Sequence, residues 1–339
     1  MIYLTRSSQV TFSDCRRKGY WSYIYRNGLD PVTPQWPLIM GLVVHKGMEF
    51  LIASSRLGPA LDMMEKEWDH LVTVEHTPDV KQKWFICEAL VRGWARVRLG
   101  PFLDEFEVLD IEKEVQAQLA PNLVLQGRAD IVVRSKRDGA LYVWNWKTTS
   151  DMKEWTEKFE DDVQAMTEAL LTQEDMKEPV RGCIFEGLYK GSMYKGVSTS
   201  PLVTGYRQNG NWSHEGRASA KTEKLSVWDN YPGGLEAWIA ALPEDVVAEQ
   251  FIRSAPVMKN DDEVRDWLRQ VVRKWTDIEY MLSPEVEEEE RLIFFDQNKG
   301  WRCRWCQFRP ACKLQMTVDD MLEGGQLKVR EDHHGRIQE

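Results

Sequence analysis

The amino-acid sequence predicts an α/β fold, and three observations lead to this class. The chain has 339 residues, of which 42% are hydrophobic and 11% aromatic, so it can bury a large core. Apolar residues recur with helical spacing as far as about Gly100. Residues 106–149 then change to a period of two, which is typical of strands, before helical spacing returns.

The region before the strands is predicted to be helical. A first helix carries Cys15, and prolines 31, 34 and 37 then interrupt the chain. A strongly apolar helix that contains His45 follows. The ranges expected for these two helices are residues 8–28 and 38–52.

After the strands, the pattern predicts further helices and a strand. Residues 191–230 are rich in Gly, Ser and Thr and are expected to form a loop or hairpin insertion, and the tail from Gly324 is expected to be frayed. The remaining elements are helices over residues 153–173, 235–242 and 261–282 and a strand over residues 182–189. We divide the chain into residues 1–104 (helical), 105–190 (core), 191–300 (insertion and helices), 301–323 (cysteine segment) and 324–339 (tail).

Composition and charge narrow the function classes. A net charge of −10 argues against a protein that coats nucleic acid without specificity, although a local basic groove remains compatible with it. No apolar run approaches the length of a membrane span, and the start of the chain does not resemble a signal peptide. We therefore expect a cytoplasmic protein that does not bind membranes.

Four cysteines predict a metal centre. Cys303, Cys306 and Cys312 form a local trio with the spacing C-x2-C-x5-C, and Cys15 is the best placed fourth ligand. Four thiolates suit an iron–sulfur cluster or zinc, and one distant cysteine with a local trio favours a 4Fe-4S cluster over the two local pairs usual for zinc. Unligated cysteines are a third interpretation. The other two, Cys87 and Cys183, lie in apolar runs and are expected to be buried.

Basic residues flank these cysteines at both ends of the chain. If one metal centre joins the two ends, it also joins these charges into a single patch that could bind nucleic acid. Trp305 lies inside the cysteine segment and is a candidate for stacking on a base, although most tryptophans of such a chain are core residues. The candidate contacts are Arg16, Arg17, Lys18, Arg304 and Trp305.

Polar residues on two successive strands predict a reaction site. Asp138-Gly139 is a strong two-residue hairpin signal, and a turn at these residues would place Asp130 opposite Lys147, with Asn145 on the diagonal. Such neighbours are close enough to share a metal ion, and a simple ion pair between Asp130 and Lys147 is the alternative. Glu112 and Glu114 add two carboxylates on the preceding strand.

These motifs resemble the RecB-like branch of the PD-(D/E)xK nuclease superfamily. The pattern G-x-x-D at Gly127–Asp130 and the pair Lys147-Thr148 resemble its core motifs, and Gly41-x-x-x-His45 resembles its helical histidine motif. Glu112 and Gln164 resemble its strand glutamate and its Q-x-x-x-Y motif. The four cysteines resemble the iron–sulfur staple of AddB-type recombination nucleases and CRISPR-associated exonucleases.

The resemblance implies a restriction-endonuclease-like core, in which a mixed sheet is flanked by helices and helical insertions, with the two chain ends joined by a 4Fe-4S cluster. It implies a DNA exonuclease that uses Mg2+ or Mn2+ on single-strand or duplex ends in recombination, repair or phage or CRISPR DNA processing. A helicase or a recombination or CRISPR protein is the implied partner. Asp130, Glu112 and His45 would bind the divalent cation, while Lys147 and Gln164 complete the site.

Two positions depart from that family pattern. Asn145 stands where the family has Asp or Glu, so a charged ligand is missing, and Glu168 stands where the Q-x-x-x-Y motif has tyrosine. Either the site is disabled, or it recruits a carboxylate from elsewhere, with Glu168 and Glu112 as candidates. The missing charge predicts weak or absent cleavage. A catalytically inactive iron–sulfur module that binds DNA or a partner is therefore the alternative function.

Overall fold

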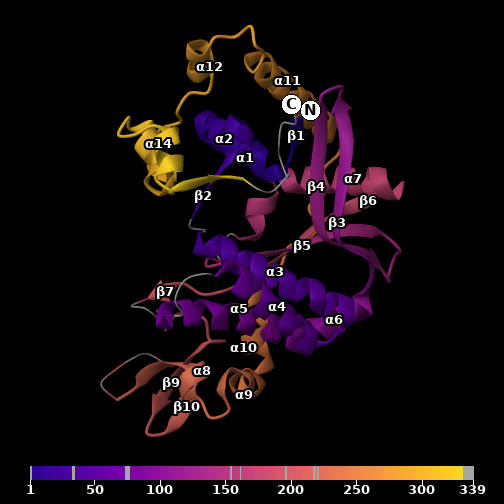
Figure 1. The fold of residues 1–339 in the computed structure, drawn as a ribbon. Helices are drawn as coiled ribbons and strands as arrows, with labels where there is room; N and C mark the ends of the chain where they lie inside the picture. The colour runs from indigo at the N-terminus through magenta and orange to yellow at the C-terminus, as the bar shows by residue number, and fades with distance from the viewer. Residues whose placement is uncertain are drawn as a thin grey trace.

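The computed structural model describes residues 2–32, 35–72, 77–152, 155–160, 162–194, 197–216, 219 and 221–330 (Figure 1). A mixed six-stranded sheet forms its centre, with the order β1-β4-β5-β6-β12 and with β3 paired to β4 as well. The strands are β1 (Ile2–Leu4), β3 (Phe106–Ala120), β4 (Leu123–Ser135), β5 (Leu141–Thr149), β6 (Val180–Tyr189) and β12 (Phe251–Arg253). The predicted α/β class and the strands over residues 106–149 are thus confirmed.

Strand β4 pairs with β1 at its start and with β5 at its end. Its C-terminal half pairs with β5 over residues 131–134, antiparallel, whereas its first residues, 123–125, pair with β1, parallel. Strand β5 is meanwhile parallel to β6 along its whole length. Strands β4 and β5 therefore part beyond the pair Ile131–Trp144, and the G-x-x-D segment, residues 127–130, lies in the fork between the two ladders.

The central strands carry apolar side chains on both faces of the sheet, so helices cover both faces. Ile131, Val133 and Trp144 belong to the core shared with the first group of helices, and Val132 and Val143 belong to the core on the opposite face. The first group comprises α3 (Trp36–Ser54), α4 (Leu57–Leu71), α5 (Pro78–Val97) and α6 (Leu99–Glu105). The opposite face is covered by α7 (Val163–Met176) and the 3₁₀ helix η2 (Thr156–Phe159).

Helix α3 starts and ends where its local sequence directs. Pro37 occupies the first turn, where main-chain amides have no acceptor within the helix, so the missing amide hydrogen of proline costs nothing. Ser55 terminates the helix in a left-handed conformation with φ 53°. Among the described residues, α3 is the one helix long and apolar enough to cross a membrane, which the sequence analysis did not anticipate. The buried core helix of a soluble protein meets the same criteria, and the buried side chains of α3 join the larger core.

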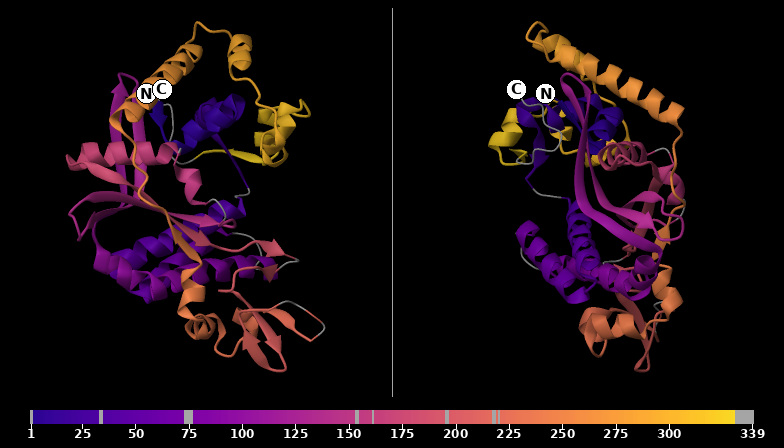
Figure 2. Two further views of the ribbon diagram at one scale, coloured as in Figure 1. Left: turned by 180° about the vertical axis from the view of Figure 1, so that it is seen from behind. Right: turned by 90° about the vertical axis from the view of Figure 1, so that its right-hand side faces the viewer.

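A third core joins the two ends of the chain. Phe12 and Tyr20 near the start pack with Trp275, Phe295 and Phe308 near the end. Figure 2 shows α11 as the long orange helix at one end of the molecule, away from α3–α6. The elements here are α1 (Arg6–Asp14), α2 (Arg16–Tyr23), η1 (Tyr25–Asn27), β2 (Leu29–Pro31), α11 (Asp261–Met281), α12 (Glu288–Phe294), η3 (Trp301–Trp305), α13 (Arg309–Cys312), α14 (Val318–Glu323) and β13 (Leu327–Val329).

The Gly- and Ser-rich segment forms small sheets and short helices beside α5. Strands β9 and β11 pair antiparallel, and Trp212, Tyr231 and Trp238 pack edge to face above them. The predicted insertion is therefore a folded lobe. Its elements are β7 (Met193–Tyr194), β8 (Val197–Ser198), β9 (Thr204–Gln208), β10 (Asn211–Ser213), β11 (Glu223–Ser226), α8 (Val227–Asn230), α9 (Gly234–Ala241) and α10 (Glu244–Ala248).

Three boundaries differ from the sequence predictions. The first predicted helix is broken at Cys15, whose extended backbone (φ −162°) ends α1 and precedes α2. The helix expected from residue 153 begins only at Val163, where Asp162 caps it. The tail is not frayed from Gly324, because β13 pairs with β2. Pro34, Lys153 and the tail beyond residue 330 lie outside the described residues.

Candidate functional site

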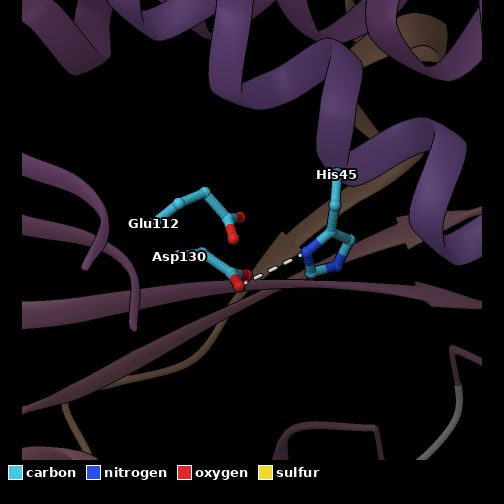
Figure 3. A group of neighbouring side chains, drawn as sticks. All are labelled: His45, Glu112 and Asp130. Atoms are coloured by element: carbon cyan, nitrogen blue, oxygen red, sulfur yellow. Dashed lines mark ion pairs between the residues drawn. The ribbon is translucent and has the colours of Figure 1, made fainter. Parts of the chain in front are cut away.

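His45, Glu112 and Asp130 form a compact group of possible metal ligands. One ligand atom of each residue lies within 4.8 Å of the others, although they come from α3, β3 and β4. Figure 3 shows the imidazole descending from the helix toward the two carboxylates, which lie side by side. The structure thus brings together the three residues that the sequence analysis named as ligands of one divalent cation.

Asp130 is held by both of its oxygens. Oδ2 accepts a hydrogen bond of 2.7 Å from the main-chain amide of Trp146, and Oδ1 lies 3.3 Å from Nδ1 of His45. Burial alone would raise the pKa of Asp130, but the charge and hydrogen bond of His45, the charge of Lys147 and the Trp146 amide together lower it. The side chain is therefore an ionised, buried carboxylate with a fixed orientation.

Glu112 stands on a strained residue of β3. Its backbone adopts φ 51°, in the left-handed region that side-chain-bearing residues avoid, and Oε2 pairs with Nε of Arg128 at 3.0 Å. Burial, assisted by the negative charge of Asp130, raises the pKa of Glu112. Backbone strain of this kind persists where the surrounding structure imposes it, and it is frequent at functional sites. Glu114 is exposed and lies outside the group.

His45 reaches the site because α3 lies close to β5. A Cβ atom on Gly41, one turn earlier on the same helix, would lie 4.0 Å from Oγ1 of Thr148. Burial lowers the pKa of His45, but the charge of Asp130 and its hydrogen bond outweigh burial, and the net shift is upward. The pairing with Asp130 thus favours the protonated form of the imidazole.

The pairing of β4 with β5 differs from the prediction by two residues. Ile131 pairs with Trp144 and Val132 with Val143, where a turn at Asp138-Gly139 would have paired Val132 with Asn145. The chain reverses through four residues, Lys136 to Gly139, because Ser135 and Ala140 form the last hydrogen-bonded pair. The predicted placement of Asp130 opposite Lys147 is therefore wrong, and continuation of the observed register brings Asp130 level with Asn145.

Asn145 belongs to a second buried polar group on the α7 side. Its Nδ2 donates to Oε2 of Glu168 at 2.7 Å, and Nε2 of Gln164 donates to Oδ1 of Asn145 at 3.1 Å and to Oε1 of Glu168 at 2.7 Å. Burial raises the pKa of Glu168 to about 7, and the positive charge of Lys147 opposes this shift. Lys147 thus acts electrostatically on both groups of carboxylates.

The four predicted cysteine ligands lie around one cavity. Cys15, at the break between α1 and α2, and the trio Cys303, Cys306 and Cys312 all line a space of about 1170 Å³. All four are free thiols. Burial raises the pKa of Cys306 and that of Cys312, the latter to about 11, and the neighbouring thiols add to both shifts. Cys87 and Cys183 are buried in the core, as predicted.

The predicted nucleic-acid contacts divide into two sets. Arg16 and Arg17 are partly used inside the molecule, since Arg16 lies over the ring of Phe294 and Nε of Arg17 donates to the carbonyl oxygen of Phe295. Arg304 and Trp305 are exposed, and Trp305 leaves 76% of its surface to solvent. Lys18 and Trp305 line the cysteine cavity.

The family of the chain follows from a comparison with known protein families. A family model described as the PD-(D/E)XK nuclease superfamily matches residues 3–313. The chain belongs to the PD-(D/E)XK nuclease superfamily. No curated protein shows significant similarity to it. In this superfamily member, the match runs from β1 to the segment after the last cysteine, and so it includes all three proposed cation ligands.

Two supporting contacts of this nuclease-family site were not predicted. Arg128, inside the G-x-x-D segment, orients Glu112, and the Trp146 amide orients Asp130. The variable positions of the motif carry no pattern that would have identified Arg128, and a main-chain donor has no sequence signal. The ion pair of Arg6 with Asp162 at the start of α7 was also not predicted, because 156 residues separate the two.

Proposed function

We propose that the chain is a divalent-metal-dependent deoxyribonuclease of the RecB-like type that hydrolyses phosphodiester bonds at DNA ends, in recombination, repair or phage or CRISPR DNA processing. The observation that carries the proposal is the group of His45, Glu112 and Asp130 beside Lys147, in a chain whose family is nucleolytic. An imidazole nitrogen and two carboxylates suit Mn2+. They also suit Mg2+, which would keep water molecules as its remaining ligands.

Each residue of the group has a defined task. When bound, a divalent cation polarises a phosphoryl oxygen and lowers the pKa of a water molecule. Asp130 and Glu112 offer oxygens whose orientations are fixed by the Trp146 amide and by Arg128. Lys147 places a positive charge near Asp130, where it would stabilise the charge that develops on the phosphate.

A cleavage assay tests this proposal. End-labelled single- and double-stranded DNA is incubated with Mn2+ and the wild-type chain, Asp130→Asn, His45→Ala or the control His70→Ala, whose side chain is exposed on α4. We expect wild type and the control to shorten the DNA, and the two site variants to lose at least about 100-fold in rate. Equal rates for wild type and Asp130→Asn would disprove the proposal.

Asn145 favours a second candidate, a DNA-binding module without catalysis. The amide offers a neutral oxygen where the family pattern has a charged one, so cation affinity would fall. Asn145→Asp separates the two candidates. Cleavage by wild type excludes the inactive module, cleavage that appears only in Asn145→Asp supports it, and DNA binding without cleavage in both supports a purely binding role.

We further propose that Cys15, Cys303, Cys306 and Cys312 hold a 4Fe-4S cluster. Four free thiols around one cavity support this. Zinc bound to four thiolates would hold their sulfurs about 3.8 Å apart. Among the described residues, however, no three cysteine sulfurs lie within 4.8 Å of one another. In a cubane each thiolate binds a different iron atom, so wider spacing fits a cluster better.

Loss of one ligand tests the cluster assignment. We expect Cys15→Ala to lose iron, brown colour and thermal stability when it is purified without oxygen, because the cluster would tie α1 and α2 to the last helices. Cys87→Ala is the matched control, since Cys87 is buried in the core away from the cavity, and it should keep its iron. A Cys15→Ala protein that keeps both its colour and its melting temperature would contradict the proposal.

A further inference from the structure

We propose that Glu168 supplies the carboxylate that Asn145 does not, so that the second anionic group of the cation site stands on α7 instead of β5. The inference rests on the proposed nuclease function and deepens it. It takes up one of the two explanations that the sequence leaves open for Asn145. Three features of α7 support it: the contacts of Glu168, the burial of Glu168 and the close packing of the helix on β4.

The side chains of Asn145 and Glu168 are in direct contact. The 2.7 Å bond from Nδ2 of Asn145 to Oε2 of Glu168 brings a carboxylate to the end of the amide that occupies the acidic position of the family pattern. Gln164 fixes the arrangement, because its Nε2 donates to both residues at once. Gln164 and Glu168 are four residues apart on α7 and therefore share one face of the helix.

Burial makes a purely structural role costly. Asn145 is fully buried and Glu168 is 4% exposed, and an ionised carboxylate in such surroundings is unfavourable unless a cation faces it. The charged groups that act on Glu168 are Lys147 and Arg6, which are positive, and Asp130, which is negative. Asp130 thus lies within electrostatic reach of both Glu112 and Glu168. Asp130 is therefore the carboxylate that links the two groups, and a divalent cation beside it would offset the negative charge of both.

An unsatisfied acceptor lies in the same group. Oε1 of Gln164 is buried and has no hydrogen-bond partner within the part of the chain that the structure describes, and Gln164 is only 5% exposed. Buried acceptors without partners are rare and call for an explanation such as a bound ion or water. A hydrated cation between Asp130 and Glu168 would provide the missing donor or positive charge.

The fold also makes room for Glu168. A Cβ atom on Gly127 of β4 would lie 3.0 Å from Cδ1 of Leu171 and 3.7 Å from Cγ of Glu168. Helix α7 therefore packs directly over the glycine of the G-x-x-D segment. This close approach delivers the Glu168 carboxylate to the strands, where a longer side chain at position 127 would hold the helix away.

Moving the carboxylate back to β5 tests the inference. Mn2+ affinity is measured by titration calorimetry, together with DNA cleavage, for wild type, Glu168→Gln and the double variant Asn145→Asp/Glu168→Gln. We expect Glu168→Gln to lose on the order of 10- to 100-fold in Mn2+ affinity and in cleavage rate. The double variant should recover both to within about 10-fold of wild type. The control is Glu174→Gln, an exposed glutamate of the same helix, which should match wild type.

The outcomes separate this inference from the proposed function. Wild-type Mn2+ affinity and cleavage in Glu168→Gln, with both lost in Asp130→Asn, would overturn the inference and leave the nuclease proposal intact. Failure of the double variant to recover Mn2+ binding would also overturn it. If Asp130→Asn and His45→Ala bind Mn2+ as wild type does, the nuclease site itself is disproved. Should Glu168→Gln not fold, the comparison of the double variant with wild type decides the question.

Discussion

The main-chain amide of Trp146 donates a 2.7 Å hydrogen bond to the carboxylate of Asp130. This contact joins β4 to β5 just beyond Ile131 and Trp144, the last residues of their ladder. The side chain of Asp130 therefore takes over the role of a main-chain acceptor at the point where the strands part. One carboxylate therefore serves both the sheet and the proposed cation site.

Substitution of Asp130 separates these two roles. Asp130→Asn keeps an acceptor for the Trp146 amide, so it should fold normally and lose Mn2+ affinity. Asp130→Ala also leaves the buried amide without a partner, which costs about 1–3 kcal/mol of unfolding free energy. Urea denaturation of both metal-free variants measures the difference. Equal stability of the two would show that the Trp146 contact contributes nothing.

We expect Glu112 to lower the stability of the fold, because its backbone is left-handed. A left-handed conformation costs roughly 1–2 kcal/mol for a residue with a side chain, and glycine avoids most of it. Glu112→Gly should therefore leave stability unchanged or raise it by up to about 1 kcal/mol, while abolishing Mn2+ binding. Glu114→Gly, on the same strand with extended backbone, should lower stability by about 1 kcal/mol. Thermal denaturation of the pair checks this.

Gly127→Ala is expected to push α7 away from β4. The added methyl would meet Cδ1 of Leu171 at 3.0 Å, and such overpacking typically costs about 1–3 kcal/mol. Cleavage should fall as well, because Glu168 moves with α7. The control is Gly58→Ala, at an exposed position of α4 where no atom lies within 4 Å of the new methyl, and it should stabilise the protein by about 0.5 kcal/mol. An unaltered melting temperature in Gly127→Ala would contradict the expectation.

Asp162 gives the stability a defined dependence on pH. It caps α7 at the amide of Gln164 (2.9 Å) and pairs with Arg6. Burial would raise the pKa of Asp162, but the Arg6 interactions and the Gln164 amide outweigh burial and lower it. Because the folded pKa is lowered, this stabilisation is complete above the ordinary value of about 3.9 and is lost as the pH falls through the folded pKa.

Two variants of Asp162 check that dependence. Asp162→Asn retains the cap and loses the charge, and Asp162→Ala loses both, with about 1 kcal/mol attributed to the cap. The stability difference between wild type and Asp162→Asn should be constant near neutral pH and should shrink in acid below about pH 3.9. A difference that stays constant down to the lowest pH at which the protein folds would exclude the charge as its source.

Trp305 is expected to contribute to DNA binding. Its ring is exposed beside Arg304 and the cysteine cavity, and stacking of a base on an aromatic side chain is worth about 1–3 kcal/mol. Trp305→Ala should therefore weaken single-stranded DNA binding by about 5- to 100-fold in a fluorescence titration. Tyr280→Ala removes a similarly exposed ring from α11 and should have no effect. Equal losses in both would indicate a general surface effect.

Much of the site could be predicted because its residues lie in patterned elements. The period-two stretch predicted β3, β4 and β5. The family resemblance predicted that His45 and Glu112 lie beside Asp130. The register could not be predicted, because Asp138-Gly139 also fits within a longer turn. Once Ser135 pairs with Ala140, every partner of β4 moves by two positions.

Contacts between distant residues account for the other failures. The break at Cys15 is stabilised by packing of α1 and α2 against Phe295 and Phe308, which no local pattern reveals. The bond of Trp146 to Asp130 uses a main-chain donor, which is the same for every residue type. Helical spacing also predicted that α7 starts at residue 153, but the helix begins ten residues later at Val163, where Asp162 caps it.

The pairing of β13 with β2 links the segment before α3 to a strand far along the chain. Asp30 on β2 receives two hydrogen bonds from Arg330, 300 residues away, and α3 with His45 begins shortly after β2. Contacts of such separation form late in folding, because the intervening chain must first be ordered. A nascent chain that stops before Leu327 therefore lacks the anchor of the segment leading to its histidine. The position of His45, a proposed cation ligand, therefore depends in part on a strand that follows it by nearly 300 residues in the chain.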